Sequence, residues 1–216
     1  MKNSNYNFIA PFYKLLSRIV FGKSLEKGSS HFFARIKKED SVLIIGGGNG
    51  EILKPLFFIC PVASISYCEL SNKMIGLANK KNPFPKEQIT FLEQDAFDLE
   101  DFQYDWIVLP FFLDQFNEVK CVHLLKSIKE NSKPSSKILF TDMNKKGISR
   151  GLLSFMYFFF KMTTGLKNKE LPDFDKVFLE SGWEMEEEEL FGNGRVVSRV
   201  YKKDKDLNSL NFAVIP

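Results

Sequence analysis

Glycines and acidic residues stand where short apolar runs of this sequence end, which is where a chain can bind a small ligand. The apolar run Val42–Ile45 leads directly into glycines at positions 46, 47, 48 and 50, and apolar residues at helical spacing follow. A strand that turns through glycines into a helix exposes backbone N–H groups at the helix N-terminus, where a ligand can approach closely. The pattern therefore predicts a small-molecule site at the carboxyl end of the first strand.

The spacing of these glycines favours S-adenosylmethionine over a dinucleotide. Dinucleotide-binding enzymes favour Gly-x-Gly-x-x-Gly, which places a pyrophosphate on the helix N-terminus. Counted from Gly46, the last glycine of that pattern is replaced by Glu51, whose carboxylate would face a pyrophosphate unfavourably. S-adenosylmethionine has no phosphate and carries a zwitterionic amino-acid end, so this carboxylate matters less to it.

Two further acids complete the predicted cofactor site. Ser64–Glu69 is typical of a second strand, and Glu69 at its end can accept hydrogen bonds from both ribose hydroxyls. Ile89–Gln94 is typical of a third strand, after which Asp95 can accept a hydrogen bond from the adenine amino group. The full set of expected cofactor-binding residues is Ile45, Gly46, Gly47, Gly48, Gly50, Glu69, Leu70, Met74, Asp95, Ala96, Leu109 and Pro110.

Four segments of the chain resemble the class I S-adenosylmethionine-dependent methyltransferases in their order and intervals. They are Leu43–Gly50, Glu69–Ala78, Glu93–Ala96 and Tyr104–Leu109. Two flanking segments, Asn7–Arg18 and Leu171–Trp183, are similar to parts of the ubiquinone- and menaquinone-type enzymes. The resemblance implies S-adenosylmethionine as cofactor and places Tyr13 near it, although Lys14 stands where the family usually has an acid.

The carboxyl ends of the fourth and fifth strands supply the candidates for contact with a methyl acceptor. Methyl transfer from a sulfonium depends mainly on alignment, and some acceptors also need a general base. Asp142 at the end of the fifth strand is the preferred polar group, whereas Asp114 could equally be a base or a helix N-cap. The sequence after Leu109 lacks the Asn/Asp-Pro-Pro-Tyr pattern of enzymes that methylate exocyclic amines, which argues against such acceptors.

The remaining elements predict one Rossmann-like, doubly wound α/β domain. Residues 42 to 141 alternate strands and helices, which implies a parallel sheet built by right-handed crossovers. Trp183–Phe191 and Arg195–Lys202 are typical of two strands joined by a glycine-containing turn. We therefore expect seven strands, mostly parallel with an antiparallel last strand, and helices on both faces. Pro55 predicts a late start or a kink in the first helix of this series.

We expect this single domain, residues 1–216, to have five parts. They are a helical cap at 1–35, a cofactor-binding core at 36–143, a substrate lid at 144–172, a last helix and hairpin at 173–203, and a tail at 204–216. The lid holds six basic residues and no acidic one between positions 145 and 169, around the apolar run Leu152–Phe160. This run is either an ordinary core helix or an apolar acceptor pocket with a cationic rim. The second alternative would favour an anionic substrate or weak association with an anionic membrane surface.

Composition gives no sign of a nucleic-acid partner and favours a reducing compartment. A net charge of +3 gives no indication of nucleic-acid binding. The three cysteines at positions 60, 68 and 121 form neither a metal-binding spacing nor an even disulfide set, and no signal peptide precedes the core, so we expect a cytoplasmic protein.

No metal site is expected from the acidic residues or the histidines. The acidic run from Glu184 to Glu189 fits a strand near a sheet edge better than a metal site, because repeated charge discourages edge-to-edge pairing. His31 and His123 have no ligand-forming companions at useful spacing, so surface or capped histidines are expected.

The sequence thus predicts a methyltransferase that uses S-adenosylmethionine and acts on a small, apolar or amphipathic molecule. One alternative is a non-catalytic protein that binds the same cofactor for regulation, and another is an NAD-dependent oxidoreductase. No feature of the sequence indicates an oligomeric state.

Overall fold

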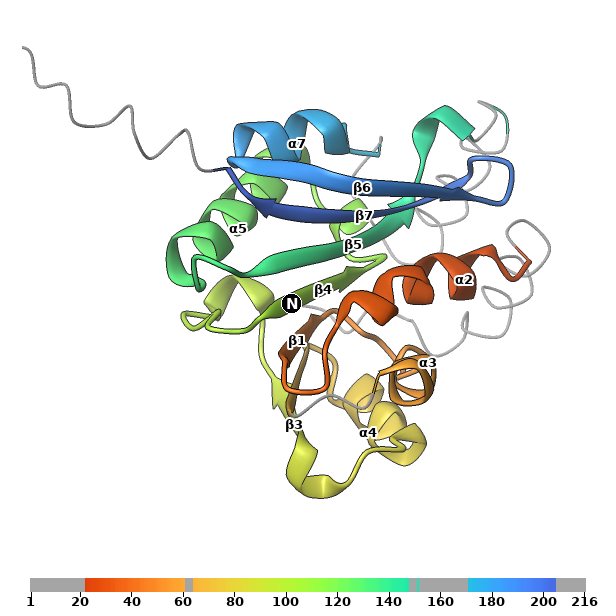
Figure 1. Cartoon of the computed structure of the whole chain (residues 1–216), viewed down its shortest axis with the longest axis vertical. Helices are drawn as coiled ribbons and strands as arrows, with labels where there is room; N and C mark the ends of the chain where they lie inside the picture. Colours follow the sequence, from red (N-terminus) through yellow and green to blue (C-terminus); the bar gives the residue numbers. More distant parts are fainter. Residues whose placement is uncertain (1–21, 61–63, 148–150, 152–170, 205–216) are drawn as a thin grey trace, which may run out of the picture.

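The computed structural model describes residues 22–60, 64–147, 151 and 171–204, which form a single seven-stranded sheet with helices on both faces (Figure 1). The order of the strands is β3-β2-β1-β4-β5-β7-β6. Only β7 runs antiparallel to its neighbours, as the sequence predicts. The strands are β1 (Ser41–Ile45), β2 (Ser64–Glu69), β3 (Ile89–Glu93), β4 (Trp106–Pro110), β5 (Lys137–Met143), β6 (Trp183–Phe191) and β7 (Val196–Lys203).

The central strands are apolar along their length because both of their faces are covered. Four of the five residues of β1 and all five of β4 are buried. These two strands pair with each other, and the chain leaves them in opposite directions across the sheet. A reversal of strand order opens a crevice at the carboxyl ends of the two strands, which is where ligands bind in open α/β sheets.

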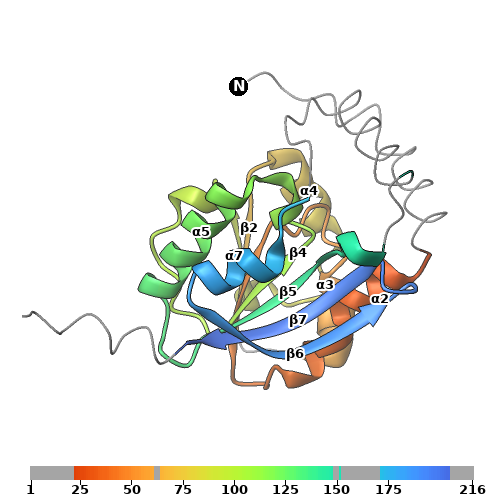
Figure 2. The same cartoon turned by 90° about the horizontal axis from the view of Figure 1, so that it is seen from above.

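Two layers of helices cover the sheet (Figures 1 and 2). One face packs against α5 (Glu118–Asn131) and α7 (Phe174–Glu180). The other face packs against η1 (His31–Arg35), α3 (Leu53–Ile59) and α4 (Asn72–Lys81). Helix α2 (Ser24–Ser30) lies against β6 and β7. The remaining short 3-10 helices are η2 (Lys86–Gln88), η3 (Ala96–Asp98), η4 (Leu113–Gln115) and η5 (Lys145–Gly147).

Successive residues of β1 supply the two halves of the core. Leu43 and Ile45 pack on the α5 and α7 side, whereas Val42 and Ile44 pack on the α3 side. This alternation follows from the two-residue period of a strand. The burial of alternate side chains on opposite faces fixes the register of β1 against β2 and β4. The position of the glycine loop that begins at Gly46 is fixed as a result.

Two helices, α3 and α5, show how local sequence and packing decide where a helix begins and which side is buried. Helix α3 begins at Leu53, which leaves Pro55 in its first turn, so the predicted late start is confirmed. In α5 the buried side chains are Cys121, Leu124, Leu125 and Ile128, whereas Val119 is 78% exposed. These four residues lie on one face of a helix with 3.6 residues per turn.

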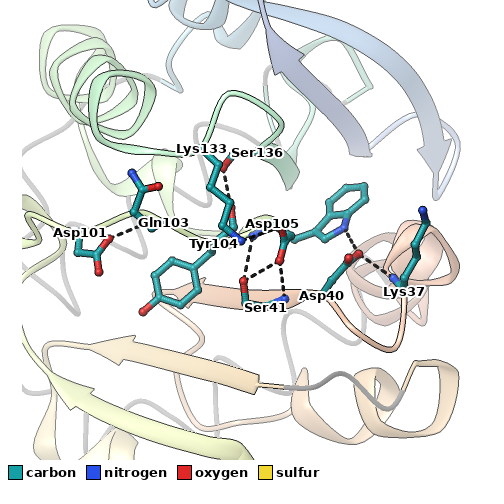
Figure 3. Close-up of polar contacts among 10 residues, drawn as sticks. Lys37, Asp40, Ser41, Asp101, Gln103, Tyr104, Asp105, Lys133 and Ser136 are labelled. Atoms are coloured by element: carbon teal, nitrogen blue, oxygen red, sulfur yellow. Dashed lines mark hydrogen bonds and ion pairs between the residues drawn. The ribbon is translucent and has the colours of Figure 1, made fainter.

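A polar network joins the amino ends of the strands, at the edge opposite the glycine loop (Figure 3). The Asp105 carboxylate accepts hydrogen bonds from the backbone N–H and the hydroxyl of Ser41, at 2.9 and 2.8 Å, and from Lys133 Nζ at 2.8 Å. The indole N–H of Trp106 donates to Asp40 at 2.9 Å. These bonds hold β1 beside β4 at their amino ends, so the carboxyl ends of the two strands stay aligned.

The C-terminal hairpin forms at the predicted position. Strands β6 and β7 are joined by residues 192–195, of which Gly192, Asn193 and Gly194 have positive φ. Strand β6 is an edge strand, and five of its nine residues are glutamates, four of them exposed. The predicted cap helix with Tyr13, and the apolar run Leu152–Phe160, lie outside the described residues. No helix in the part of the chain that the structure describes is long and apolar enough to cross a membrane.

Candidate active site

The glycines after β1 serve two different purposes. A Cβ added at Gly46 would collide with the Phe112 ring, and one at Gly50 would lie 2.6 Å from the Cα of Ala78. At Gly47 an added Cβ would lie 2.5 Å from the Tyr67 ring. These three glycines therefore allow close packing of the protein against itself.

Gly48 is different because the described residues leave the space beside it open. Its φ is +62°, and a Cβ built there would meet no atom of those residues within 4 Å. Two contacts hold its peptide units: the Tyr67 hydroxyl donates to the Gly48 carbonyl at 3.0 Å, and the Gly48 N–H donates to Glu69 Oε2 at 3.1 Å. Gly48 is thus a fixed, bare backbone position that a ligand can approach.

Glu69 lies at the end of β2 and links that end to the glycine loop. Besides the bond from Gly48, its Oε1 accepts a hydrogen bond from the Ser71 N–H at 3.0 Å. The side chain is half-buried. Because an ionised carboxylate has about four lone-pair sites, these two bonds leave acceptor capacity for the two hydroxyls of a ribose.

The other predicted cofactor residues lie around the same edge of the sheet. Strands β2 and β3 pair in register up to Glu69 and Glu93, so Asp95 follows β3 at this edge. Asp95 Oδ1 accepts from the Phe97 N–H at 3.1 Å and caps η3, and Ala96 is buried. On the neighbouring segment Leu70 is exposed and Met74 is half-buried, which provides an apolar surface beside Glu69.

Three of the predicted cofactor residues are buried within the sheet. Ile45, Leu109 and Pro110 are covered on both faces. Contact between these residues and a ligand would therefore involve their backbone rather than their side chains. Tyr13 lies outside the described residues, so its position near the cofactor stays a prediction.

The turn after β4 is strained and carries aromatic residues. Phe111 has φ of +50°, a conformation that costs a bulky residue about 1–3 kcal/mol and often marks a functional site. Its N–H donates to the Thr141 carbonyl at 2.7 Å, which fixes the turn to β5. The next residue, Phe112, places its ring against Gly46.

An aromatic row runs from this turn across the carboxyl edge of the sheet. The Phe112 and Phe116 rings lie 5.1 Å apart, and Phe116 and Phe97 are also 5.1 Å apart, each pair edge to face. Phe97 and Phe116 were not among the predicted site residues. The one signal for them is the total of 23 phenylalanines, more than an ordinary core needs. An aromatic row beside a small-molecule site favours apolar or aromatic ligands.

The two candidate aspartates meet at the carboxyl ends of β4 and β5. Asp142 is fully buried; its Oδ1 accepts from the Met143 N–H at 2.7 Å and its Oδ2 from the Asp114 N–H at 3.2 Å. Asp114 belongs to η4 and does not cap α5, because Asn117 fills that role by accepting from the Lys120 N–H at 2.9 Å. The Oδ1 atom of Asp114 is buried and accepts no hydrogen bond from the part of the chain that the structure describes.

Burial changes the acidity of these groups. It raises the pKa of Asp114 to about 7. Burial, together with the charge of Asp114, raises the pKa of Asp142 well above its usual range. Burial and then the two carboxylates raise the pKa of the nearby Cys121 thiol to about 12. The aspartates therefore titrate as a coupled pair beside a neutral thiol.

The other polar candidates lie elsewhere. His31 and His123 are both exposed, as predicted for surface histidines. Among the residues that the structure describes, no group of histidine, cysteine, aspartate and glutamate side chains is arranged to hold a metal ion.

A family model for the O-methyltransferase domain matches residues 17–184, which is most of the chain. The match includes the glycine loop, Glu69, Asp95 and both aspartates of the pair. A comparison with curated protein sequences gives no match.

Several solved methyltransferase structures share the fold. Mitomycin 7-O-methyltransferase MmcR is 18% identical with a TM-score of 0.69, over 90% of this chain and 58% of that one. A second structure is the O-methyltransferase NcsB1 from neocarzinostatin biosynthesis, in complex with S-adenosylmethionine and 2-hydroxy-5-methyl naphthoic acid. It is 17% identical with a TM-score of 0.66, and the match covers 90% of this chain and 57% of that one. Human N-acetylserotonin methyltransferase, in complex with S-adenosylmethionine, is 20% identical with a TM-score of 0.62, and the match covers 83% of this chain and 52% of that one. This chain thus spans just over half the length of these proteins.

Proposed function

The chain belongs to the O-methyltransferase domain family, and from this membership we propose that it transfers the methyl group of S-adenosylmethionine to a hydroxyl oxygen of a small molecule. The observation that carries the proposal is the pairing of Gly48 with Glu69. An open glycine and a carboxylate with remaining acceptor capacity lie together at the carboxyl ends of β1 and β2. This arrangement suits an adenosyl ligand, whose ribose offers two hydroxyl donors and which has no phosphate.

The residues that would hold the cofactor follow from their positions. Gly48 leaves room beside the loop, Glu69 accepts from the ribose hydroxyls, and Asp95 accepts from the adenine amino group through the oxygen that does not cap η3. Leu70 and Met74 supply apolar contact for the adenine ring. When bound, S-adenosylmethionine supplies a methyl group on a positively charged sulfur, which is a good leaving group.

The acceptor proposed is an aromatic hydroxyl compound, such as a phenol or a quinol. The row formed by Phe97, Phe112 and Phe116 supports an apolar ring, and the strained Phe111 supports a constrained site at the end of β4. The similarity of Leu171–Trp183 to the ubiquinone- and menaquinone-type enzymes agrees with such an acceptor. Two proteins with this fold are also named for, or complexed with, small ring compounds, a mitomycin and a naphthoic acid.

The contribution of the chain to the reaction is mainly positional. The acceptor oxygen must approach the methyl carbon in line with the bond to sulfur, and correct orientation can supply much of the acceleration. Aromatic side chains around the site exclude water that would otherwise compete for the methyl group. Family membership favours this reaction over the hydride transfer of an oxidoreductase.

Turnover with a labelled cofactor tests the proposal. The protein is incubated with S-adenosylmethionine carrying a ¹³C methyl group and with phenol, hydroquinone or aniline, and the products are analysed by mass spectrometry. We expect the label on oxygen in the first two and none on the aniline nitrogen. Label on nitrogen would contradict the proposed acceptor class, and cofactor binding without any transfer would support the regulatory alternative.

We also propose a reducing compartment, the cytoplasm, and a weak contact with anionic membranes. Cys60, Cys68 and Cys121 are all free and buried, which suits a reducing environment.

Of the cations between positions 145 and 169, the described residues include Lys145 and Lys146, and Lys146 pairs with Asp175 at 3.0 Å. Co-sedimentation with anionic vesicles tests the contact: we expect binding that is lost at high salt, and no binding at low salt would contradict it.

A further inference from the structure

We infer that Tyr67 is a positioning residue for the cofactor. Its hydroxyl holds the peptide between Gly48 and Asn49 so that the Asn49 N–H, rather than the Gly48 carbonyl, faces the carboxylate at the amino-acid end of S-adenosylmethionine. The inference rests on the proposed function, because it needs the cofactor to lie at the carboxyl ends of β1 and β2. Tyr67 itself is fully buried and acts through the glycine loop.

The glycine loop contains a tight turn at residues 47–50. The Gly50 N–H donates to the Gly47 carbonyl at 3.4 Å, and this bond closes the turn. Its two central residues are Gly48 and Asn49, of which only Gly48 has a positive φ, as in a type II′ turn. If the central peptide flips, the turn becomes type I′, with positive φ at both residues. Glycine and asparagine both tolerate a positive φ, so this sequence permits either orientation.

Strand β2 selects one orientation of the central peptide. Tyr67 and Glu69 are two residues apart, so their side chains lie on the same face of the strand. The Tyr67 hydroxyl donates to the Gly48 carbonyl at 3.0 Å, which fixes the peptide after Gly48. Glu69 accepts from the Gly48 N–H at 3.1 Å, which fixes the peptide before it. Both peptide units around Gly48 are therefore held from β2.

The packing of the core sets the position of the Tyr67 hydroxyl. The ring lies directly against Gly47, where an added Cβ would be 2.5 Å from it. On β3 the ring of Phe91 packs beside it, with the centroids 5.3 Å apart. Burial, and then the charge of Glu69, raises the pKa of Tyr67 above its usual range, so the hydroxyl keeps its proton and remains a donor.

The fixed peptide presents a backbone donor. The peptide between Gly48 and Asn49 is trans, so its N–H points opposite to its carbonyl. Because the carbonyl points at Tyr67, the Asn49 N–H points away from that buried ring. Within the part of the chain that the structure describes, no acceptor bonds to this N–H. A carboxylate is a strong acceptor for a backbone N–H, so a ligand with one could bind here.

The order of the strands brings the amino-acid end of the cofactor to this donor. The strands lie in the order β3-β2-β1. The proposed contacts are Asp95 after β3 for the adenine and Glu69 at the end of β2 for the ribose. The amino-acid chain continues from the ribose through the sulfur, so its carboxylate comes to the loop after β1. A flipped peptide would present the Gly48 carbonyl there, and the two acceptors would repel each other.

Two ligands test the inference, because only one of them has the amino-acid end. S-adenosylhomocysteine carries it, whereas 5′-methylthioadenosine has the same adenine and ribose without it. Calorimetry is carried out with both ligands on the wild type, on Tyr67→Phe and on the control Tyr104→Phe. The Tyr104 hydroxyl also bonds to β2, at 2.8 Å from Ser66 Oγ, but on the opposite face of the strand from Tyr67.

Only the ligand with the amino-acid end should respond to Tyr67. We expect Tyr67→Phe to weaken S-adenosylhomocysteine binding about fivefold, as for the loss of one hydrogen bond, and 5′-methylthioadenosine binding less than twofold. Tyr104→Phe should change neither affinity by more than twofold, and Glu69→Ala should weaken both, because both ligands have the ribose. Equal losses of the two ligands in Tyr67→Phe would show a structural role, and no loss would show that the hydroxyl does not position the loop. Either result would overturn the inference.

Gly47→Ala does not replace Tyr67→Phe in this test. The added methyl group displaces the Tyr67 ring, but the hydroxyl is retained and can still donate to Gly48. The cost of such an overpacked site appears in stability.

An NMR measurement on the wild type tests the same point without a variant. The Asn49 amide proton should shift downfield when S-adenosylhomocysteine is bound and not when 5′-methylthioadenosine is bound, because a hydrogen bond to a carboxylate deshields the proton. No such shift at saturation would overturn the inference, even if Tyr67→Phe failed to fold. Failure of the wild type to bind either ligand would contradict the proposed function itself. Binding of S-adenosylhomocysteine that does not depend on Tyr67 would contradict the inference alone.

Discussion

Gly47 and Gly48 are neighbours in the sequence, yet their missing side chains serve different ends. Gly47 leaves room for the Tyr67 ring, which is the largest fully buried side chain among the residues that the structure describes. Gly48 leaves room on the open side, where its positive φ turns the backbone toward a ligand. One residue therefore supports the fold and the other supports binding.

Alanine at each position should separate the two roles. In Gly47→Ala the new methyl group would collide with Tyr67, so we expect a loss of about 1–3 kcal/mol in the free energy of unfolding, as for other overpacked sites. In Gly48→Ala there is space for the methyl group, and the positive φ alone costs about 1–2 kcal/mol.

The affinity for S-adenosylhomocysteine should be lowered more by Gly48→Ala than by Gly47→Ala. We expect Gly48→Ala to weaken S-adenosylhomocysteine binding at least tenfold, because the methyl group occupies the space beside the loop, and Gly47→Ala to weaken it less than threefold. Chemical denaturation and calorimetry on both variants measure the two effects. A larger loss of affinity in Gly47→Ala would show that the ligand does not approach Gly48.

At this scale the sequence predicts the glycine loop but not the use of each glycine. The partners that decide the difference are Tyr67, Ala78 and Phe112, which follow the loop by 20 to 66 positions and reach it only in the folded chain. The same limit applies to the aspartates. Their order along the chain predicts that both lie at the carboxyl ends of strands, but the buried Asp114 oxygen without a partner among the described residues appears only when η4 packs beside β5.

At the scale of elements, the strands are the best predicted part of the chain. Val42–Ile45 and Ser64–Glu69 lie within the observed β1 and β2, because continuous apolar runs and alternation are local patterns. The buried face of α5 could not be predicted in the same way, because the neighbouring sheet and α7 decide which of its residues are covered. The short helices η3 and η4 had no sequence signal, and these carry Ala96 and Asp114.

At the scale of the whole molecule, the two edges of the sheet have separate tasks. The amino edge is closed by the network around Asp105, whose hydrogen bonds from Lys133 and Ser41 outweigh partial burial and lower its pKa (Figure 3). The carboxyl edge holds the open glycine, Glu69, the aromatic row and the aspartate pair. The network around Asp105 supports the amino edge, and the strained Phe111 and the buried Asp114 oxygen lie at the opposite edge.

Binding of S-adenosylmethionine at the carboxyl ends of β1 and β2 is tested most directly by calorimetric titration with S-adenosylhomocysteine. We expect one molecule to bind the wild type and NAD not to bind. Glu69→Ala should weaken binding at least tenfold, because charged hydrogen bonds are worth about 1.5–3 kcal/mol each, and a Glu184→Ala control on the distant β6 should bind as the wild type does. No heat of binding with the wild type, or unchanged affinity in Glu69→Ala, would contradict the assignment.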